Sequence, residues 1–153
     1  MELSKMEAFS EDSGEGGSSR MADKCNAFGI HIVRCEQLYN KSYDFEGAEF
    51  DNVLHGAMFE FDEATVLFRE IITFIAKEMG TASLNEVSDC CKWFKERTAT
   101  EAYVVQILDF MSSYDASHTA LSIVRFKEFM LRSTGLLKGL YLLLDAFVGS
   151  VGV

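Results

Sequence analysis

The chain has 153 residues, 48% of them hydrophobic, so it is long enough to form one domain with a sizeable core and too short to favour a second. Its 24 acidic residues against 14 basic ones give a formal charge of -10, which disfavours nucleic acid or an anionic membrane as a partner. The four cysteines show no C-x-x-C spacing, and the sequence opens on no signal-peptide pattern. They are therefore predicted to be free thiols in a reducing compartment.

The first 21 residues contain the run SEDSGEGGSSR, which is acidic and rich in Gly and Ser. Such a segment cannot bury enough apolar surface to offset the entropy lost on ordering. We therefore expect residues 1–21 to form a disordered tail, and residues 22–153 to form a single domain.

Apolar residues recur at helical spacing in three segments of the first half. They predict helices over residues 28–40, 50–61 and 68–79, with a bend near Asp62 between the last two. Gly80 follows the third segment and suits the left-handed position that ends many helices.

Two pairs with capping-box spacing predict where the next helices begin. These pairs are Ser83 with Glu86 and Thr98 with Glu101. In such a box the hydroxyl accepts from a first-turn amide and the glutamate reaches back to the cap amide. The fourth helix is therefore expected to start at Ser83 and the fifth at Thr98.

The segment from Thr98 to Met111 is the only one that is apolar on two faces. One face holds Val104, Ile107, Leu108 and Met111, and the other holds Tyr103, Gln106 and Phe110. A surface helix would make one of these faces polar. The pattern predicts that this helix, over about 98–113, is the buried centre of the domain.

Two more helices complete the pattern. The sixth is expected to run from a Ser117 cap to about Arg132 and to end at Gly135. Its expected inner face consists of Ala120, Ile123, Val124 and Met130. The seventh covers 136–148, where Lys138 and Asp145 interrupt the apolar run, so it is expected to pack rather than to span a membrane. No segment alternates like a strand, so the fold class is all-α, a bundle of about seven helices.

Motifs for catalysis or for metal binding are not found. The sequence has no phosphate-binding loop, no nucleophile-elbow motif and no histidine pair at i, i+4. His31, His55 and His118 fall on separate expected helices, which favours surface or hydrogen-bonded positions over a ligand role. We therefore expect no enzyme activity, no metal and no cofactor, and treat a haem carrier as the weakest alternative.

Four short segments of the sequence resemble homology motifs of the Bcl-2 family, and the first two lie in the first half of the chain. Residues 37–47, QLYNKSYDFEG, are similar to the fourth homology motif, K-L-x-x-[RK]-G-Y-x-W. Residues 54–61, LHGAMFEF, are similar to the third, L-x-x-A-G-D-E-F.

The remaining motifs follow in the family's order. Residues 80–82 and 93–96 resemble the run into the first motif, and 104–110 resembles the central helix that follows it. Residues 144–148, LDAFV, are similar to the second motif, W-D-A-F-V. Together the motifs cover 28–148 and resemble the compact members carried by large DNA viruses of vertebrates, with an iridoviral protein of a fish host as the nearest.

The sequence also departs from the family pattern. Thr100 to Tyr103 stand where the family has Asn-Trp-Gly-Arg, so the groove arginine is replaced by a tyrosine. Met58 and Phe59 replace Gly-Asp of the third motif, and Leu144 replaces the tryptophan of the second. The family's C-terminal membrane anchor has no counterpart. Partner binding is therefore expected to depend on apolar contacts more than on a charge pair.

The resemblance implies an apoptosis inhibitor that holds the amphipathic BH-3 helix of Bim-, Bid-, Bak- or Bax-like proteins in an apolar groove. It implies a cytoplasmic protein of the host cell that reaches mitochondria only through its partners. The groove residues carried over by position are Phe61, Thr65, Phe68, Ile72, Trp93, Thr100, Ala102, Tyr103, Gln106 and Phe110. Core packing is the competing interpretation for each of them. The alternative function is a homodimeric scaffold that uses the same apolar surface for self-association.

Overall fold

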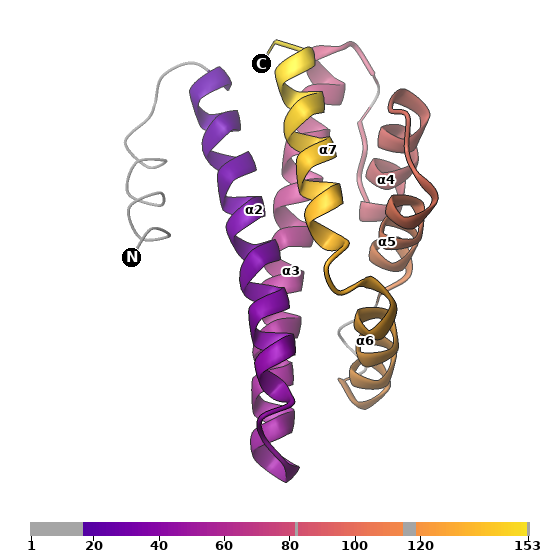
Figure 1. The fold of residues 1–153 in the computed structure, drawn as a ribbon. Helices are drawn as coiled ribbons and strands as arrows, with labels where there is room; N and C mark the ends of the chain where they lie inside the picture. The colour runs from indigo at the N-terminus through magenta and orange to yellow at the C-terminus, as the bar shows by residue number, and fades with distance from the viewer. Residues whose placement is uncertain (1–16, 82, 115–118, 153) are drawn as a thin grey trace.

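The computed structural model describes residues 17–81, 83–114 and 119–152, which form six α-helices without a strand. The helices are α2 Gly17–Ser42, α3 Gly47–Glu78, α4 Val87–Arg97, α5 Ala102–Ser113, α6 Thr119–Ser133 and α7 Leu137–Ser150. Figure 1 shows α2 and α3 side by side as a long pair, with α7 packed along it and with α4, α5 and α6 beyond α7. The all-α prediction is confirmed.

The two helices predicted over 50–61 and 68–79 form one continuous helix, α3. No glycine or proline lies between Phe61 and Phe68, and buried residues continue at helical spacing through Ala64. Asp62 lies on a partly exposed side of the helix, so its charge does not interrupt the buried side. The prediction of two separate helices here is therefore wrong.

The centre of the domain is α3 rather than the segment 98–113. α3 packs against α2, α4 and α6 and buries side chains from Leu54 to Ala76. α5 buries only one of its two apolar faces, leaving Tyr103 and Phe110 partly exposed and Gln106 exposed. The prediction failed because the second face is only partly covered, by the edges of α6 and α7.

Neither predicted capping box forms. α4 and α5 begin at Val87 and Ala102, and each has a glutamate N-cap without a side-chain capping bond. Thr98 instead closes the preceding helix, because its hydroxyl donates to the carbonyl of Phe94 at 3.0 Å. The carbonyls at the end of a helix lack intrahelical donors, and the threonine supplies one to them.

The two glycine stops are confirmed. Gly80 has a φ of 79°, and the amide of Thr81 donates to the carbonyl of Ala76 at 2.9 Å, the bond that defines a Schellman end. Gly135, with a φ of 86°, follows the end of α6. Its amide donates to Glu36 Oε2 at 2.6 Å, which ties the α6–α7 turn to α2.

The first described helix begins earlier than predicted. α2 starts at Gly17, and Met21 and Cys25 are buried in the core, so the domain boundary predicted at residue 21 falls inside this helix. The remainder of the predicted tail, residues 1–16, lies outside the described residues. All four cysteines are buried free thiols, as predicted.

The buried face of α6 differs from the predicted one. Met130 is buried and Ile123 is partly buried, but Ala120 and Val124 are exposed. Phe126 and Phe129 take the inner face instead. The predicted cap, Ser117, lies outside the described residues.

Aromatic side chains explain the orientation of α6. Phe61 of α3 lies within ring-contact distance of four other aromatic residues, with centroid separations of 5.5 to 5.9 Å. Those partners are Phe110, Tyr114, Phe126 and Phe129, and with Phe61 they form what we term the aromatic cluster. Each such pair adds to the energy of area burial. The cluster therefore joins α3, α5 and α6.

α7 packs closely on its neighbours through two glycines. A Cβ on Gly29 of α2 would lie 2.6 Å from the ring of Tyr141, and Gly139 of α7 lies under the phenol of Tyr103. Because glycine has no Cβ, a tyrosine ring can pack directly against the helix at each of these positions. A larger residue there would displace the ring. Within the described ranges, no helix is long and apolar enough to cross a membrane.

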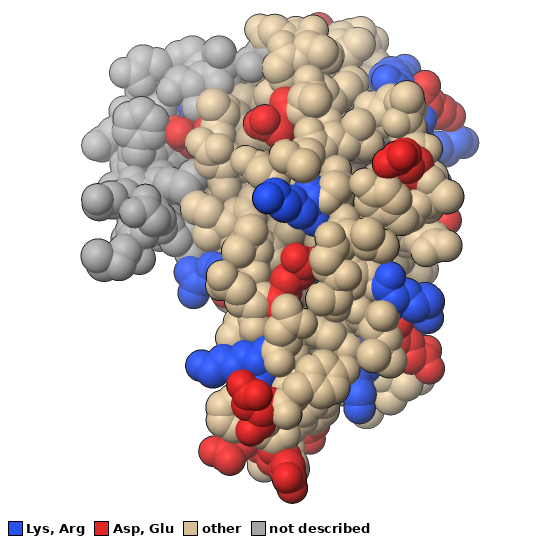
Figure 2. Space-filling model, viewed as in Figure 1, with Lys and Arg blue, Asp and Glu red and all other residues tan. Residues whose placement is uncertain are grey.

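Charge is unevenly distributed on the surface. On the face drawn in Figure 2, acidic side chains gather at the lower end, where the α2–α3 turn lies, while the part covered by α7 carries scattered charges. Asp44, Glu46, Glu49 and Asp51 are exposed at this turn.

The core can be tested at Leu108, which is fully buried in α5. Leu108→Ala should lower the free energy of unfolding by about 2 to 5 kcal/mol, because it removes buried methyl groups and leaves a cavity. Leu142→Ala, at an exposed position of α7, serves as the control and should cost less than about 1 kcal/mol. Urea unfolding measures both, and equal losses would contradict the described packing.

Candidate functional site

Four of the ten predicted groove residues lie in the core. Phe61, Phe68, Ile72 and Trp93 are at most 4% exposed. Phe68 packs edge-on against Phe94, and the indole of Trp93 donates to Thr81 Oγ1 at 3.1 Å. These four side chains do not line an open groove in this structure, so core packing describes them better.

The predicted residues of α5 share one side of the helix but contact different neighbouring helices. Ala102 and Gln106 are exposed, and the Thr100 hydroxyl lies 2.7 Å from that of Thr98. Tyr103 lies against α7, whereas Phe110 stacks on Phe129 of α6 with ring centroids 4.0 Å apart. α7 and α6 thus cover the two ends of this side of α5, and the exposed Gln106 lies between them.

A different surface depression lies where α3, α4 and α5 meet. Its volume is about 310 Å³, at the small end of ligand pockets. We call it the α3–α4–α5 hollow, and its lining consists of Asp62, Thr65, Val66, Glu86, Val87, Ser88, Met111, Ser112 and Tyr114. Of the predicted groove residues, only Thr65 lines it.

The hollow combines apolar walls with acidic groups. Met111 is buried, Val87 is partly buried and Val66 is exposed at the rim. Asp62 and Glu86 are its ionisable carboxyl groups, and neither has an ion-pair partner among the described residues. A ligand here would therefore meet apolar side chains and unpaired negative charge together.

Burial changes the titration of two groups in the hollow. Desolvation, with repulsion from Glu63, raises the pKa of Asp62 to about 6. Desolvation, with the negative charge of Asp62 as the next cause, raises the pKa of the Tyr114 phenol. The Tyr114 hydroxyl oxygen is buried and has no hydrogen-bond partner in this part of the structure. Among the described residues, the Tyr114 hydroxyl thus lacks a hydrogen bond, and the Asp62 carboxylate lacks an ion-pair partner.

Sequence reasoning missed most of this lining, although one signal was present. Asp62, Thr65 and Val66 occupy positions i, i+3 and i+4, which share one side of a helix. These three residues share a side only if α3 continues as a single helix through residue 62. On the α4 side, the capping-box prediction places Glu86 in the first turn of a helix that begins at Ser83, whereas in the structure Glu86 is the N-cap of α4.

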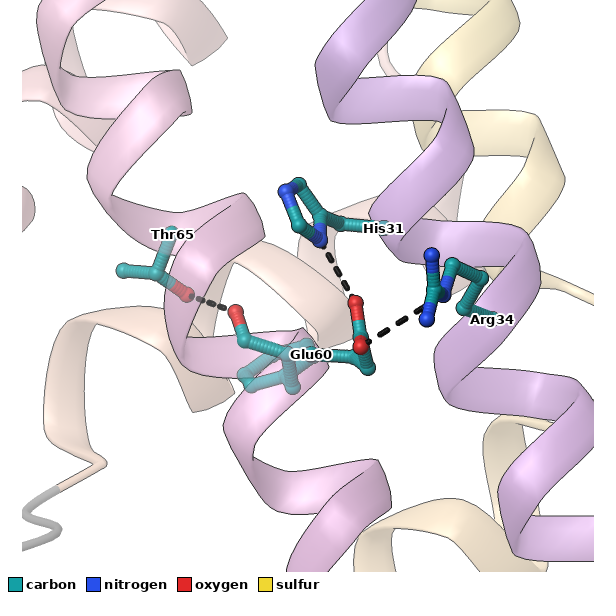
Figure 3. A network of polar contacts seen from close by, with 5 residues as sticks. His31, Arg34, Glu60 and Thr65 are labelled. Atoms are coloured by element: carbon teal, nitrogen blue, oxygen red, sulfur yellow. Dashed lines mark hydrogen bonds and ion pairs between the residues drawn. The ribbon is translucent and has the colours of Figure 1, made fainter. Parts of the chain in front are cut away.

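A polar network on the α2 side of α3 is separate from the hollow (Figure 3). His31 Nδ1 lies 2.6 Å from Glu60 Oε1, and Arg34 Nε lies 3.5 Å from Glu60 Oε2. His31 and Glu60 are buried, and Thr65 lies on the side of α3 that faces away from α2. The network therefore joins α2 to α3.

The histidines occupy the hydrogen-bonded positions that were predicted, as far as they are described. His31 contacts Glu60, and His55 Nδ1 lies 2.8 Å from the carbonyl oxygen of Asp51. His118 lies outside the described residues. Within the described ranges, no group of three or more His, Cys, Asp or Glu is arranged to hold a metal ion.

Comparisons with protein-family models, with curated proteins and with solved structures return no match to this chain. The resemblance to the Bcl-2 family therefore depends on the sequence motifs alone, and the hollow must be interpreted from its own chemistry.

The polar network can be tested against a second ion pair between the same helices. Glu60→Ala should lower the free energy of unfolding by about 1 to 3 kcal/mol, because it leaves the buried His31 without its partner. Glu70→Ala removes the more exposed Lys24–Glu70 pair, 2.8 Å long, and should cost less than about 1 kcal/mol. Urea unfolding that showed equal costs would contradict a stabilising role for the network.

The raised pKa of Asp62 predicts a pH dependence of stability. The folded state binds this proton more tightly than the unfolded chain, so the stability that Asp62 contributes is present below about pH 4 and is lost as the pH rises through about 6. Asp62→Asn should therefore raise the free energy of unfolding near neutral pH, by up to about 1 kcal/mol after solvent screening. At about pH 4 the variant and the wild type should be equally stable. Asp44→Asn at the exposed α2–α3 turn is the control, and a loss of stability in Asp62→Asn near neutral pH would contradict the prediction.

Proposed function

We propose that this protein is a Bcl-2-like apoptosis inhibitor that sequesters an amphipathic BH-3 helix in the host cytoplasm. The observation that carries the proposal is the α3–α4–α5 hollow, a concave surface with apolar walls formed by Val66, Val87 and Met111. A hollow of this kind suits the apolar residues of an amphipathic helix.

The arrangement of the motif-like segments supports the proposal. Residues 54–61 lie in α3, 93–96 lie in α4 and 104–110 lie in α5. The hollow therefore lies between the three helices that carry the third-motif, first-motif and central-helix resemblances. Residues 144–148 lie in α7, which packs on α5.

A partner helix would bind along the outer side of α3. An apolar side chain would enter between Val66 and Val87 and contact Met111. Phe59, which is 58% exposed two turns before Val66, would supply a second apolar contact. Because Phe68, Ile72 and Trp93 are covered by the core, the hollow has room for one or two anchors only.

The family's charged contact has no equivalent at Tyr103. That side chain lies against Gly139 of α7 and does not line the hollow. A partner aspartate would therefore find no cation there, and its replacement should change the affinity little.

The proposal is tested with a panel of synthetic Bim-, Bid-, Bak- and Bax-like helices titrated into the protein by calorimetry. Val66→Glu should weaken binding by about tenfold or more, because it places a charge within an apolar contact. Val33→Glu on α2 is the matched control, since Val33 and Val66 are 43% and 42% exposed, and it should bind like wild type. Failure of all the helices to bind wild-type protein, or equal losses in the two variants, would contradict the proposed function.

A homodimeric scaffold is the second candidate, and α6 provides the observation that favours it. Leu121, Val124 and Leu131 are 63%, 53% and 66% exposed and lie along the outer side of this helix. Exposed apolar stripes of this kind are common at interfaces. Sedimentation of the free protein distinguishes the candidates, because a concentration-dependent dimer that excludes BH-3 helices would favour the scaffold.

A further inference from the structure

We infer that the partner helix bound at the α3–α4–α5 hollow carries a lysine or arginine between its apolar anchors, and that Asp62 and Glu86 select that basic residue. The inference rests on the proposed function and adds the chemical class of the partner.

The outer side of α3 presents an alternating surface beside the hollow. Phe59, Asp62, Glu63 and Val66 occupy positions i, i+3, i+4 and i+7, so they share one side of the helix. Two exposed apolar residues thus flank two carboxylates. A partner helix lying along this side meets apolar, acidic and apolar groups in turn.

The second carboxylate of the hollow comes from a different element. Glu86 is the N-cap of α4 and lines the hollow together with Asp62 of α3. No Lys, Arg or His belongs to the described lining. Carboxylates on two sides and cations on none give this surface a preference for a basic side chain.

Three basic residues of α4 and α6 are engaged elsewhere. Lys95 binds Asp109 at 3.0 Å, and Arg125 donates to the carbonyl of Ser113 at 2.9 Å. Arg97 lies over the ring of Trp93, with its Cζ 4.2 Å from the ring centroid. Arg69 is exposed one turn beyond Val66 on α3, but it does not line the hollow, so no cation of the described lining neutralises Asp62 and Glu86.

Desolvation makes this pairing stronger than an ordinary surface contact. Asp62 is partly buried, and its pKa near 6 records the cost of keeping its carboxylate charged there. An incoming cation removes part of that cost. An acidic residue at the same place would be repelled, and the net charge of -10 steers a basic partner toward the protein.

The test uses two designed amphipathic helical peptides as probes. Both have the same leucine anchors, and the position between the anchors is lysine in one and glutamate in the other. Calorimetry near neutral pH compares the two peptides on the full chain, on Asp62→Asn/Glu86→Gln and on a control, Asp44→Asn/Glu46→Gln. The control removes an equal number of carboxylate charges, two, from the exposed α2–α3 turn. Asp62→Asn is expected to be at least as stable as wild type near neutral pH, and Glu86 makes no side-chain capping bond, so a binding change in the double variant would not come from unfolding.

Wild type should bind the lysine peptide about tenfold more tightly than the glutamate peptide, since a partly desolvated charge pair contributes on that scale. The preference should fall below about threefold in Asp62→Asn/Glu86→Gln, persist in the control and weaken with added salt. Equal affinities, a preference for glutamate, no binding of either peptide, or a preference that survives Asp62→Asn/Glu86→Gln would overturn the inference.

The outcomes for the two proposals are distinguishable. Lysine selection at the hollow without binding of any BH-3 helix would support the inference and reject the proposed function. BH-3 binding that is sensitive to Val66→Glu, with no discrimination between the two designed peptides, would support the function and overturn the inference.

Discussion

The contact between α2 and α3 is the interaction on which the rest of the structure depends. Both helices are long, and their interface combines apolar packing, such as Phe28 against Phe68 with centroids 6.3 Å apart, with the buried His31–Glu60 pair. A buried carboxylate is tolerated only where its hydrogen bonds are satisfied, so this pair restricts how the two helices can be aligned. α7 then packs on α2, while α4 and α6 pack on α3.

The hollow follows from where the shorter helices end. α4 begins at Val87 and α5 ends at Ser113, so two helix ends meet the side of α3 near Val66. Helix ends carry backbone groups without intrahelical partners, which favours small polar and acidic residues there. Ser88 and Ser112 line the hollow, and their small side chains leave space that larger apolar residues would fill.

Periodicity in the sequence predicted the all-α class and the glycine stops, because both depend on local chemistry. The predictions were wrong at Thr98, whose hydroxyl could serve either the preceding or the following helix, and near Asp62, where two helices were expected and one continuous helix forms. The candidate site was harder still to predict. Phe61 and Phe110 would be apolar whether they faced a groove or the rings of α6, and only the packed structure shows that both contact Phe129 of α6.

The same argument explains why a resemblance in motifs transfers apolar positions better than charges. An apolar residue on a helix has one requirement, removal from water, which several neighbours can meet. A charged contact requires a specific partner at a specific distance. Here Tyr103 lies against α7, while unpaired carboxylates line the hollow between α3 and α4. If a helix binds this surface, the polarity of the charge pair is therefore the reverse of the family's, with the anion on the receptor and the cation on the ligand.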